Sequence, residues 1–288
     1  MHEQLAGLAP GTPLALVVAP GLGLALAWDG GATVVPTPTP YAEVARIEAE
    51  HSPRWVWWTA RETALPLVAD GVRPRACWDL GAVGRLLHGL DRDDPGAVWA
   101  ASHALPEPER AEGELTLLDL AGDGDAADAL RPDGHLSREW LRGHWAADLD
   151  DARTWAELAL RLQQRQADAV RALPDRRPAP GGSPLPFLVA LSESMAALLC
   201  VELEHDGLAI DRATLEAFLT ATVGPRPRSE AEEAAARRAR DSAVWEQFPG
   251  EPVDLRNPAL VRDLLSRIGV DVPDTRSWRL EPYADSSP

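Results

Sequence analysis

The 288-residue sequence predicts an α/β domain followed by an all-α segment. Three observations lead to this fold class. Short apolar runs separated by turn residues open the chain, strand and helix patterns alternate after them, and only helical patterns follow a proline-rich stretch near residue 180. We therefore place one domain at residues 1–173, a linker at residues 174–186 and a second domain at residues 187–288.

The first part of the chain reads as a meander of three strands. Residues 14–18, 22–28 and 32–35 are apolar runs, and Gly21 and Gly30 lie in the turns between them. The elements after them are expected as helix, strand, helix, strand and helix at residues 41–51, 54–58, 62–69, 75–78 and 81–88. A meander followed by this alternation is the order of ribonuclease H-like nucleases, so the sequence predicts an α/β ribonuclease H-like (exonuclease-type) domain.

The pattern weakens over residues 91–136, where residues 121–126 read as a surface loop. A long helix is expected at residues 150–173, because apolar residues recur there at helical spacing. The 14 residues at 173–186 contain five prolines and two glycines, which neither a helix interior nor a central strand tolerates. This stretch is therefore interpreted as an interdomain linker.

Only helices are expected after the linker. Gly207 is placed to stop the first of them, and Asp211 is placed to cap a second that continues to residue 219. Further helices are expected at residues 229–246 and 257–268. This part of the chain is the all-α segment.

The charge balance limits the kinds of partner. The formal net charge is -17, and all 28 basic residues are arginine, which argues against a freestanding nucleic-acid binder with a basic face. No apolar run of about 18 residues occurs and the first residues do not resemble a signal peptide, so we expect a cytoplasmic monomer without a membrane partner. Cys77 and Cys200 lie far apart within apolar stretches and are expected to be buried free thiols.

Two segments of the second domain resemble a known family. In residues 193–211, a helical pattern ends in an acidic residue and is followed by a glycine and an apolar-x-Asp sequence. In residues 253–276, a helix begins at an Asn-Pro pair and is followed by a Gly, a Pro and a Thr. Both resemble the start of the polymerase portion of family A (DNA polymerase I-like) enzymes, of the bifunctional 3'-5' exonuclease/DNA polymerase type. The resemblance covers residues 187–282, with Leu260 and Asp254 where the family has Gln and Asn.

The resemblance implies that the chain is the N-terminal portion of a DNA-directed DNA polymerase of replication or repair, ending in the thumb. Its partner would be a DNA primer-template, and Mg²⁺ would be the cofactor of the full-length family. The palm aspartates and the fingers helix of that family have no counterpart here. Without carboxylates to hold a metal pair, the chain alone is expected to bind no cofactor and to be inactive as a nucleotidyltransferase.

The same resemblance raises the question of exonuclease activity. A nuclease of this fold needs about four carboxylates around two metal ions, the first two from an Asp-x-Glu on the first strand. No acidic residue lies between Glu3 and Asp29, so the exonuclease-like domain is expected to be inactive, with no metal site. Asp79, Asp148 and Asp150 are candidate relics of the catalytic site; the alternative is a helix N-cap for Asp79 and dipole-favoured first-turn acids for the other two.

The basic residues of the second domain are the candidates for DNA contact. By family position, this stretch of the thumb follows the duplex backbone, where arginines neutralise phosphates. The candidates are Arg226, Arg228, Arg237, Arg238, Arg240 and Asn257. A solvated helix face is the alternative, because Glu230, Glu232 and Glu233 lie at pairing distance along the helix.

Two other functions remain as alternatives. One is an active metal-dependent 3'-5' exonuclease that draws its ligands from positions such as Asp79 and Asp148. The other is a non-catalytic DNA-binding scaffold. Trp55, Trp57 and Trp58 fit either a base-stacking platform or, more simply, a buried strand.

Overall fold

The computed structural model describes residue 5 and residues 7–108, 128–175, 177, 182–248 and 253–284. The chain divides into two compact units, Met1–Leu208 and Ala209–Pro288. The loop predicted at residues 121–126 lies outside the described residues.

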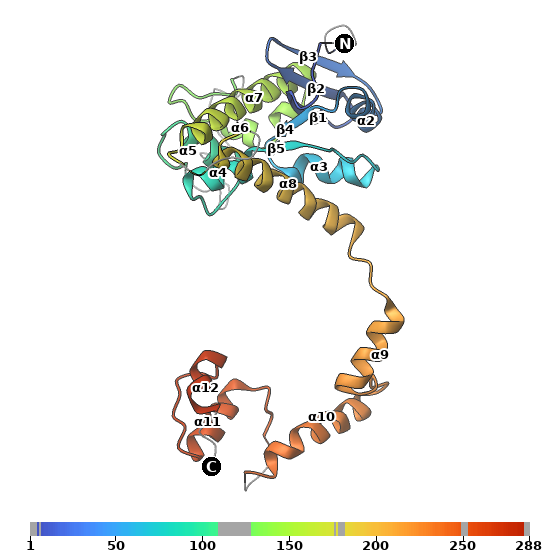
Figure 1. Cartoon of the computed structure of the whole chain (residues 1–288), viewed down its shortest axis with the longest axis vertical. Coiled ribbons are helices and arrows are strands. Elements are labelled where there is room, and N and C mark those ends of the chain that lie inside the picture. The colour runs from blue at the N-terminus through green and yellow to red at the C-terminus, as the bar shows by residue number, and fades with distance from the viewer. Residues whose placement is uncertain are drawn as a thin grey trace, which may run out of the picture. The chain divides into compact units, whose positions relative to one another are not determined.

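A five-stranded mixed sheet forms the centre of the first unit (Figure 1). Its strands are β1 Pro13–Ala19, β2 Gly23–Trp28, β3 Gly31–Pro36, β4 Arg54–Trp57 and β5 Cys77–Asp79. The order is β3-β2-β1-β4-β5, in which β1 pairs with β2 antiparallel and with β4 parallel, and β4 pairs with β5 parallel. Gly23 allows the β1–β2 turn at φ 147°, where a Cβ would meet the Val35 carbonyl oxygen.

Helices cover both faces of this sheet (Figure 1). They are α2 Pro40–His51, α3 Ala60–Ala69, α4 Leu80–His88, α5 Pro95–Ser102, α6 Arg138–Leu141, η1 His144–Ala146, α7 Leu149–Ala172 and α8 Leu185–Asp206. Alternate residues of β1 enter different cores: Ala15 and Val17 join the cluster that includes α7, and Leu14 and Leu16 join the cluster that includes α2, α3 and α8. The predicted α/β domain followed by helices is confirmed.

The position of α8 sets the extent of the first unit. The proline-rich stretch does separate α7 from α8, but α8 then packs on β5, α3 and α4. Ala190, Leu198 and Val201 are buried in this contact, so the first compact unit extends to Leu208. The sequence places the boundary at residues 174–186 instead, because a helical pattern does not indicate which element its apolar stripe will meet.

The outer side of α8 also exposes apolar side chains. Among the described helices, α8 alone is long and apolar enough to cross a membrane. Leu199 and Leu203 are 52% and 42% exposed. Cys200 is also exposed, so the expectation of a buried thiol is wrong for Cys200 and confirmed for Cys77. The reason is that Cys200 lies on the side of α8 that faces away from the sheet.

The second unit consists of helices in its described part. They are α9 Arg212–Val223, α10 Glu230–Trp245, α11 Pro258–Arg267 and α12 Ser277–Ala284. Asp211 caps α9 as predicted, and its carboxylate accepts hydrogen bonds from the backbone amides of Ala213 and Thr214. Leu264 is the one buried apolar side chain among the described residues of this unit.

Candidate functional site

The first strand lies where a nuclease of the expected type would hold its first two carboxylates. β1 is flanked by β2 and β4, and its side chains from Leu14 to Val17 are at most 4% exposed. All of them are apolar, and Ala15 and Val17 belong to the core beneath α7. This strand therefore offers no ligand to a metal ion on either face.

Tryptophan side chains fill the space between this face and the start of α7. Trp58 stacks on Trp155 with ring centroids 4.3 Å apart, and Trp140 and Trp145 lie 6.1 and 6.4 Å from the Trp155 ring. Trp58, Trp140 and Trp155 are buried in the same core as Ala15. The region is thus a packed aromatic cluster (Trp58, Trp140, Trp145 and Trp155) and not a polar cleft.

Asp79 lies at the junction of β5 and α4. Its Oδ1 accepts a hydrogen bond from the Ala82 amide at 2.8 Å, and its Oδ2 accepts one from the Ala60 amide at 2.6 Å. The first bond caps α4, and the second holds the first residue of α3. Burial raises the pKa of Asp79 to about 6, although these amide bonds favour the charged form. Both oxygens are already used within the fold, which favours the N-cap alternative.

Asp148 and Asp150 lie at the start of α7. Asp148 is the N-cap, and its Oδ1 accepts from the Asp151 amide at 2.9 Å. Asp150 is paired with Arg153 at 3.1 Å, and Asp151 lies 3.5 Å from the His144 ring. Burial and the neighbouring Asp148 raise the pKa of Asp151. These acids therefore act as capping and first-turn residues, the alternative role that the sequence allows them.

The implied metal ions do not fit this arrangement. In the described part of the chain, no group of three or more His, Cys, Asp or Glu side chains has the geometry to hold a metal ion. Asp79 is also 3% exposed and bound to two backbone amides, so a cation would have to displace both bonds. These carboxylates therefore do not support a metal-dependent hydrolytic step.

The arginines of the second unit lie on and just before α10. Arg237 forms an ion pair with Glu233, whereas the guanidinium groups of four other arginines form no ion pair with a described carboxylate; these are Arg226, Arg228, Arg238 and Arg240. The backbone amide of Arg228 donates to Glu232 Oε2 at 2.7 Å. The remaining candidate is Asn257, whose side-chain oxygen caps α11 by accepting from the Ala259 amide at 3.0 Å. Four guanidinium groups thus remain available on this surface, and their contact with DNA stays a prediction.

The two tryptophans of β4, and Trp58 directly after the strand, lie in the protein core. Trp55 and Trp57 are fully buried, and Trp58 is 4% exposed. Trp55 Nε1 also donates to Glu48 Oε2 at 2.7 Å, which satisfies a buried carboxylate. The base-stacking alternative is therefore wrong, and the buried strand is confirmed.

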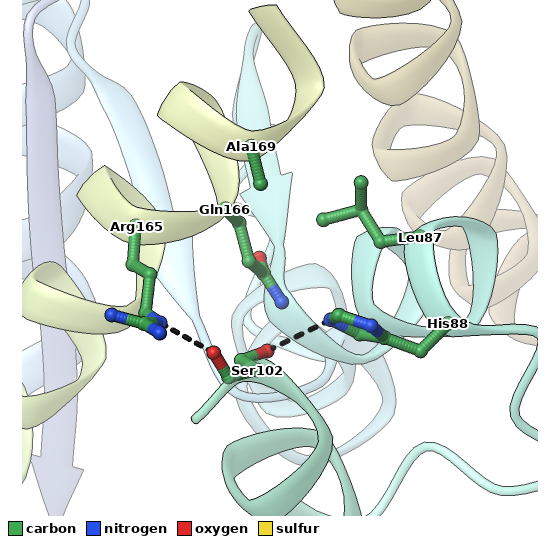
Figure 2. A pocket seen from close by; sticks show the side chains of 6 residues that line it. All are labelled: Leu87, His88, Ser102, Arg165, Gln166 and Ala169. Carbon is green, nitrogen blue, oxygen red and sulfur yellow. Dashed lines mark hydrogen bonds between the residues drawn. The ribbon is translucent and has the colours of Figure 1, made fainter. Parts of the chain in front are cut away.

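The structure also contains a pocket that no sequence motif indicates. A cavity of about 260 Å³ lies between α4, α5 and α7 (Figure 2). Its lining residues are Leu87, His88, Ser102, Arg165, Gln166 and Ala169. The His88 Nε2 lies 3.3 Å from the Ser102 Oγ, and the Arg165 Nε donates to the Ser102 carbonyl oxygen. Ser102 lies 14 residues from His88 and 63 residues from Arg165 along the chain, so no local pattern predicts the pocket.

Two comparisons of the sequence with known proteins find no relative. A search of protein-family models finds no match to the chain, and a search of curated proteins finds none either. Function is therefore inferred from the fold, from the geometry of the site and from the sequence resemblance.

Proposed function

We propose that this chain is the N-terminal portion of a family A DNA-directed DNA polymerase, with an inactive exonuclease-like domain and without the polymerase active site. The observation that supports this most directly is the sheet order β3-β2-β1-β4-β5, with an antiparallel start and parallel β1, β4 and β5. That arrangement is the one expected of a ribonuclease H-like exonuclease domain. Cytoplasmic location and a DNA primer-template partner are parts of the same proposal.

The inactivity of the first domain is supported by three features. Its central strand is apolar, and the aromatic cluster fills the region where metal ions would bind. In addition, Asp79 caps α4 and accepts a hydrogen bond from the first amide of α3. Losing both first-strand ligands removes a two-metal site, because the remaining carboxylates cannot hold two ions in register.

The assignment of the second unit to a polymerase thumb is supported by its surface. Large apolar side chains in this unit are 37 to 65% exposed. They are Ile210, Leu215, Phe218, Leu219, Val223, Val244, Leu260, Ile268, Trp278 and Tyr283. Extensive exposed apolar surface marks a contact with another protein surface, and in this proposal that surface is the rest of the polymerase.

A paired activity assay tests the first half of the proposal. Purified protein is incubated with a 3'-labelled single strand, and separately with a primed template and dNTPs, each with Mg²⁺ or Mn²⁺. We expect neither shortening nor extension. Metal-dependent shortening that disappears in Asp79→Asn but persists in the matched exposed variant Glu157→Gln would establish the exonuclease alternative instead.

A complementation assay tests the second half. The chain is mixed with a separately expressed fingers and palm portion of a family A polymerase from a GC-rich bacterium. We expect template-dependent extension in the mixture, its loss in Phe218→Asp, and its retention in Glu216→Ala on the same helix. If the mixture extends no primer, or if Phe218→Asp behaves like Glu216→Ala, the thumb assignment is wrong.

A further inference from the structure

The cavity between α4, α5 and α7 has one arginine, Arg165, in its lining (Figure 2). Arg165 lines it, Arg161 lies one helical turn earlier on α7, and both act electrostatically on His103. No carboxylate within the described residues pairs with Arg161 or Arg165, although the whole chain has a net charge of -17. Arginines that lack a carboxylate partner in the described part of so acidic a chain favour an anionic partner.

Arg165 is held in place but keeps donors free. Its Nε donates to the Ser102 carbonyl oxygen at the C-terminal end of α5, which fixes the guanidinium plane. No bond to a described residue uses its two terminal nitrogens, so four N–H groups remain for a ligand. A planar fork with free N–H groups matches two oxygens of a phosphate.

His88 and Ser102 add uncharged hydrogen-bonding groups on the other side. The Ser102 hydroxyl is 3.3 Å from His88 Nε2, and Figure 2 shows both side chains directed toward one another. Burial and the nearby Arg165 lower the pKa of His88, which favours the neutral form of its ring. The ring can then donate one hydrogen bond and accept another.

The remaining wall consists of one hydrogen-bonded amide side chain and two apolar side chains. Gln166 is already engaged, because its Oε1 accepts from Trp78 Nε1 at 2.9 Å and its Nε2 donates to the Leu80 carbonyl oxygen at 3.0 Å. Leu87 and Ala169 supply apolar surface beside it. A volume of about 260 Å³ admits a small organic ion but no large cofactor.

We propose that this cavity binds a phosphate group, with the Arg165 guanidinium as the main contact and one supporting hydrogen bond from the His88–Ser102 pair. The phosphate can be free or part of a small monoester whose apolar portion lies against Leu87 and Ala169. This binding site is separate from the polymerase proposal, because it involves neither DNA nor the second unit.

Isothermal titration calorimetry with the full chain at pH 7 tests the site. Inorganic phosphate and phenyl phosphate are the two probes, and phenol is the blank for apolar contact alone. We expect saturable binding of at least one phosphate, with the tighter probe identifying the source. Arg165→Gln should weaken it about tenfold or more, as expected for a lost charge-assisted hydrogen-bond pair.

Arg171→Gln is the matched control, because it removes the same charge from the same helix. Its guanidinium is already paired with Asp168 and lies over the Phe187 ring, so phosphate binding should be unchanged. His88→Ala, at an exposed position, is a second test that does not depend on the folding of Arg165→Gln and should weaken binding several-fold. The proposal is overturned if neither phosphate saturates, or if Arg171→Gln weakens binding as much as Arg165→Gln.

Discussion

The carboxylate of Asp79 holds the amide of Ala60 at 2.6 Å, across 19 residues of sequence. The same carboxylate caps α4. One side chain therefore stabilises the first turns of two helices that follow neighbouring strands. We expect Asp79→Ala to lower the free energy of unfolding by about 2 to 4 kcal/mol, because one buried and one partly buried amide lose their acceptor. Urea unfolding measures this change, and Glu157→Ala on the exposed side of α7 should stay within about 0.5 kcal/mol of the parent.

Stability should also depend on pH through Asp79. Burial raises the pKa of Asp79 to about 6 in the folded protein, above its ordinary value of 3.8, so the folded state binds this proton more tightly than the unfolded state does. This contribution is complete below about pH 4 and is lost as the pH rises through 6, by about 3 kcal/mol in all.

The measurement is a series of urea unfolding curves between about pH 4 and pH 7.5 for the parent and for Asp79→Asn. The difference between the two curves isolates Asp79 from other groups whose pKa is raised by burial, such as Glu62. The parent should lose stability relative to Asp79→Asn as the pH rises. Parallel curves would mean that the carboxylate is ionised throughout this range.

Gln166 should be a strong determinant of stability. It joins the Trp78 indole to the Leu80 carbonyl oxygen and is 1% exposed. Gln166→Met keeps the length of the side chain but leaves both groups unpaired, so we expect a loss of about 2 to 4 kcal/mol. Gln164→Met, two residues earlier and exposed, is the control, and equal midpoints for the two variants in urea would contradict the role given to Gln166.

Truncated fragments should show whether the first domain ends at Leu208 or at residues 174–186. A fragment of residues 1–208 should unfold at the same urea concentration as the whole chain, since the second unit buries little of its own apolar surface. A fragment of residues 1–186 lacks α8 and exposes β5 and α3, so it should be insoluble or much less stable.

The loss of the Ser194 hydroxyl should destabilise the fragment of residues 1–186 further. This hydroxyl accepts a hydrogen bond from the Asp79 amide at 3.0 Å, so removing α8 also leaves a buried donor without its partner. Equal stability of the two fragments would place the boundary at residues 174–186, as the sequence alone indicates.

Local signals predict most of the elements. Apolar runs with glycine turns indicate β1 to β3, and spaced apolar residues indicate α7. In contrast, α5 has no such signal, because it is buried on nearly every side and therefore lacks an amphipathic period. The helix α12 also escapes prediction, because Pro282 lies inside it.

Local sequence signals also predict only part of the candidate sites. The N-cap role of Asp79 can be predicted from its place before α4, whereas its bond to Ala60 depends on how β4 and β5 align. The His88, Ser102 and Arg165 grouping arises only when three helices pack together. Such contacts are set by tertiary packing, for which a single sequence carries no periodic signal.

The aromatic cluster also limits which substitutions the first strand can tolerate. Acidic residues at Ala15 and Val17 would have to enter a core already occupied by Trp58 and Trp155. Until those rings were replaced by smaller side chains, each new charge would be buried without water or a counterion and would destabilise the domain. A carboxylate pair on this strand is therefore expected to lower the stability of the domain unless the neighbouring tryptophans are replaced as well.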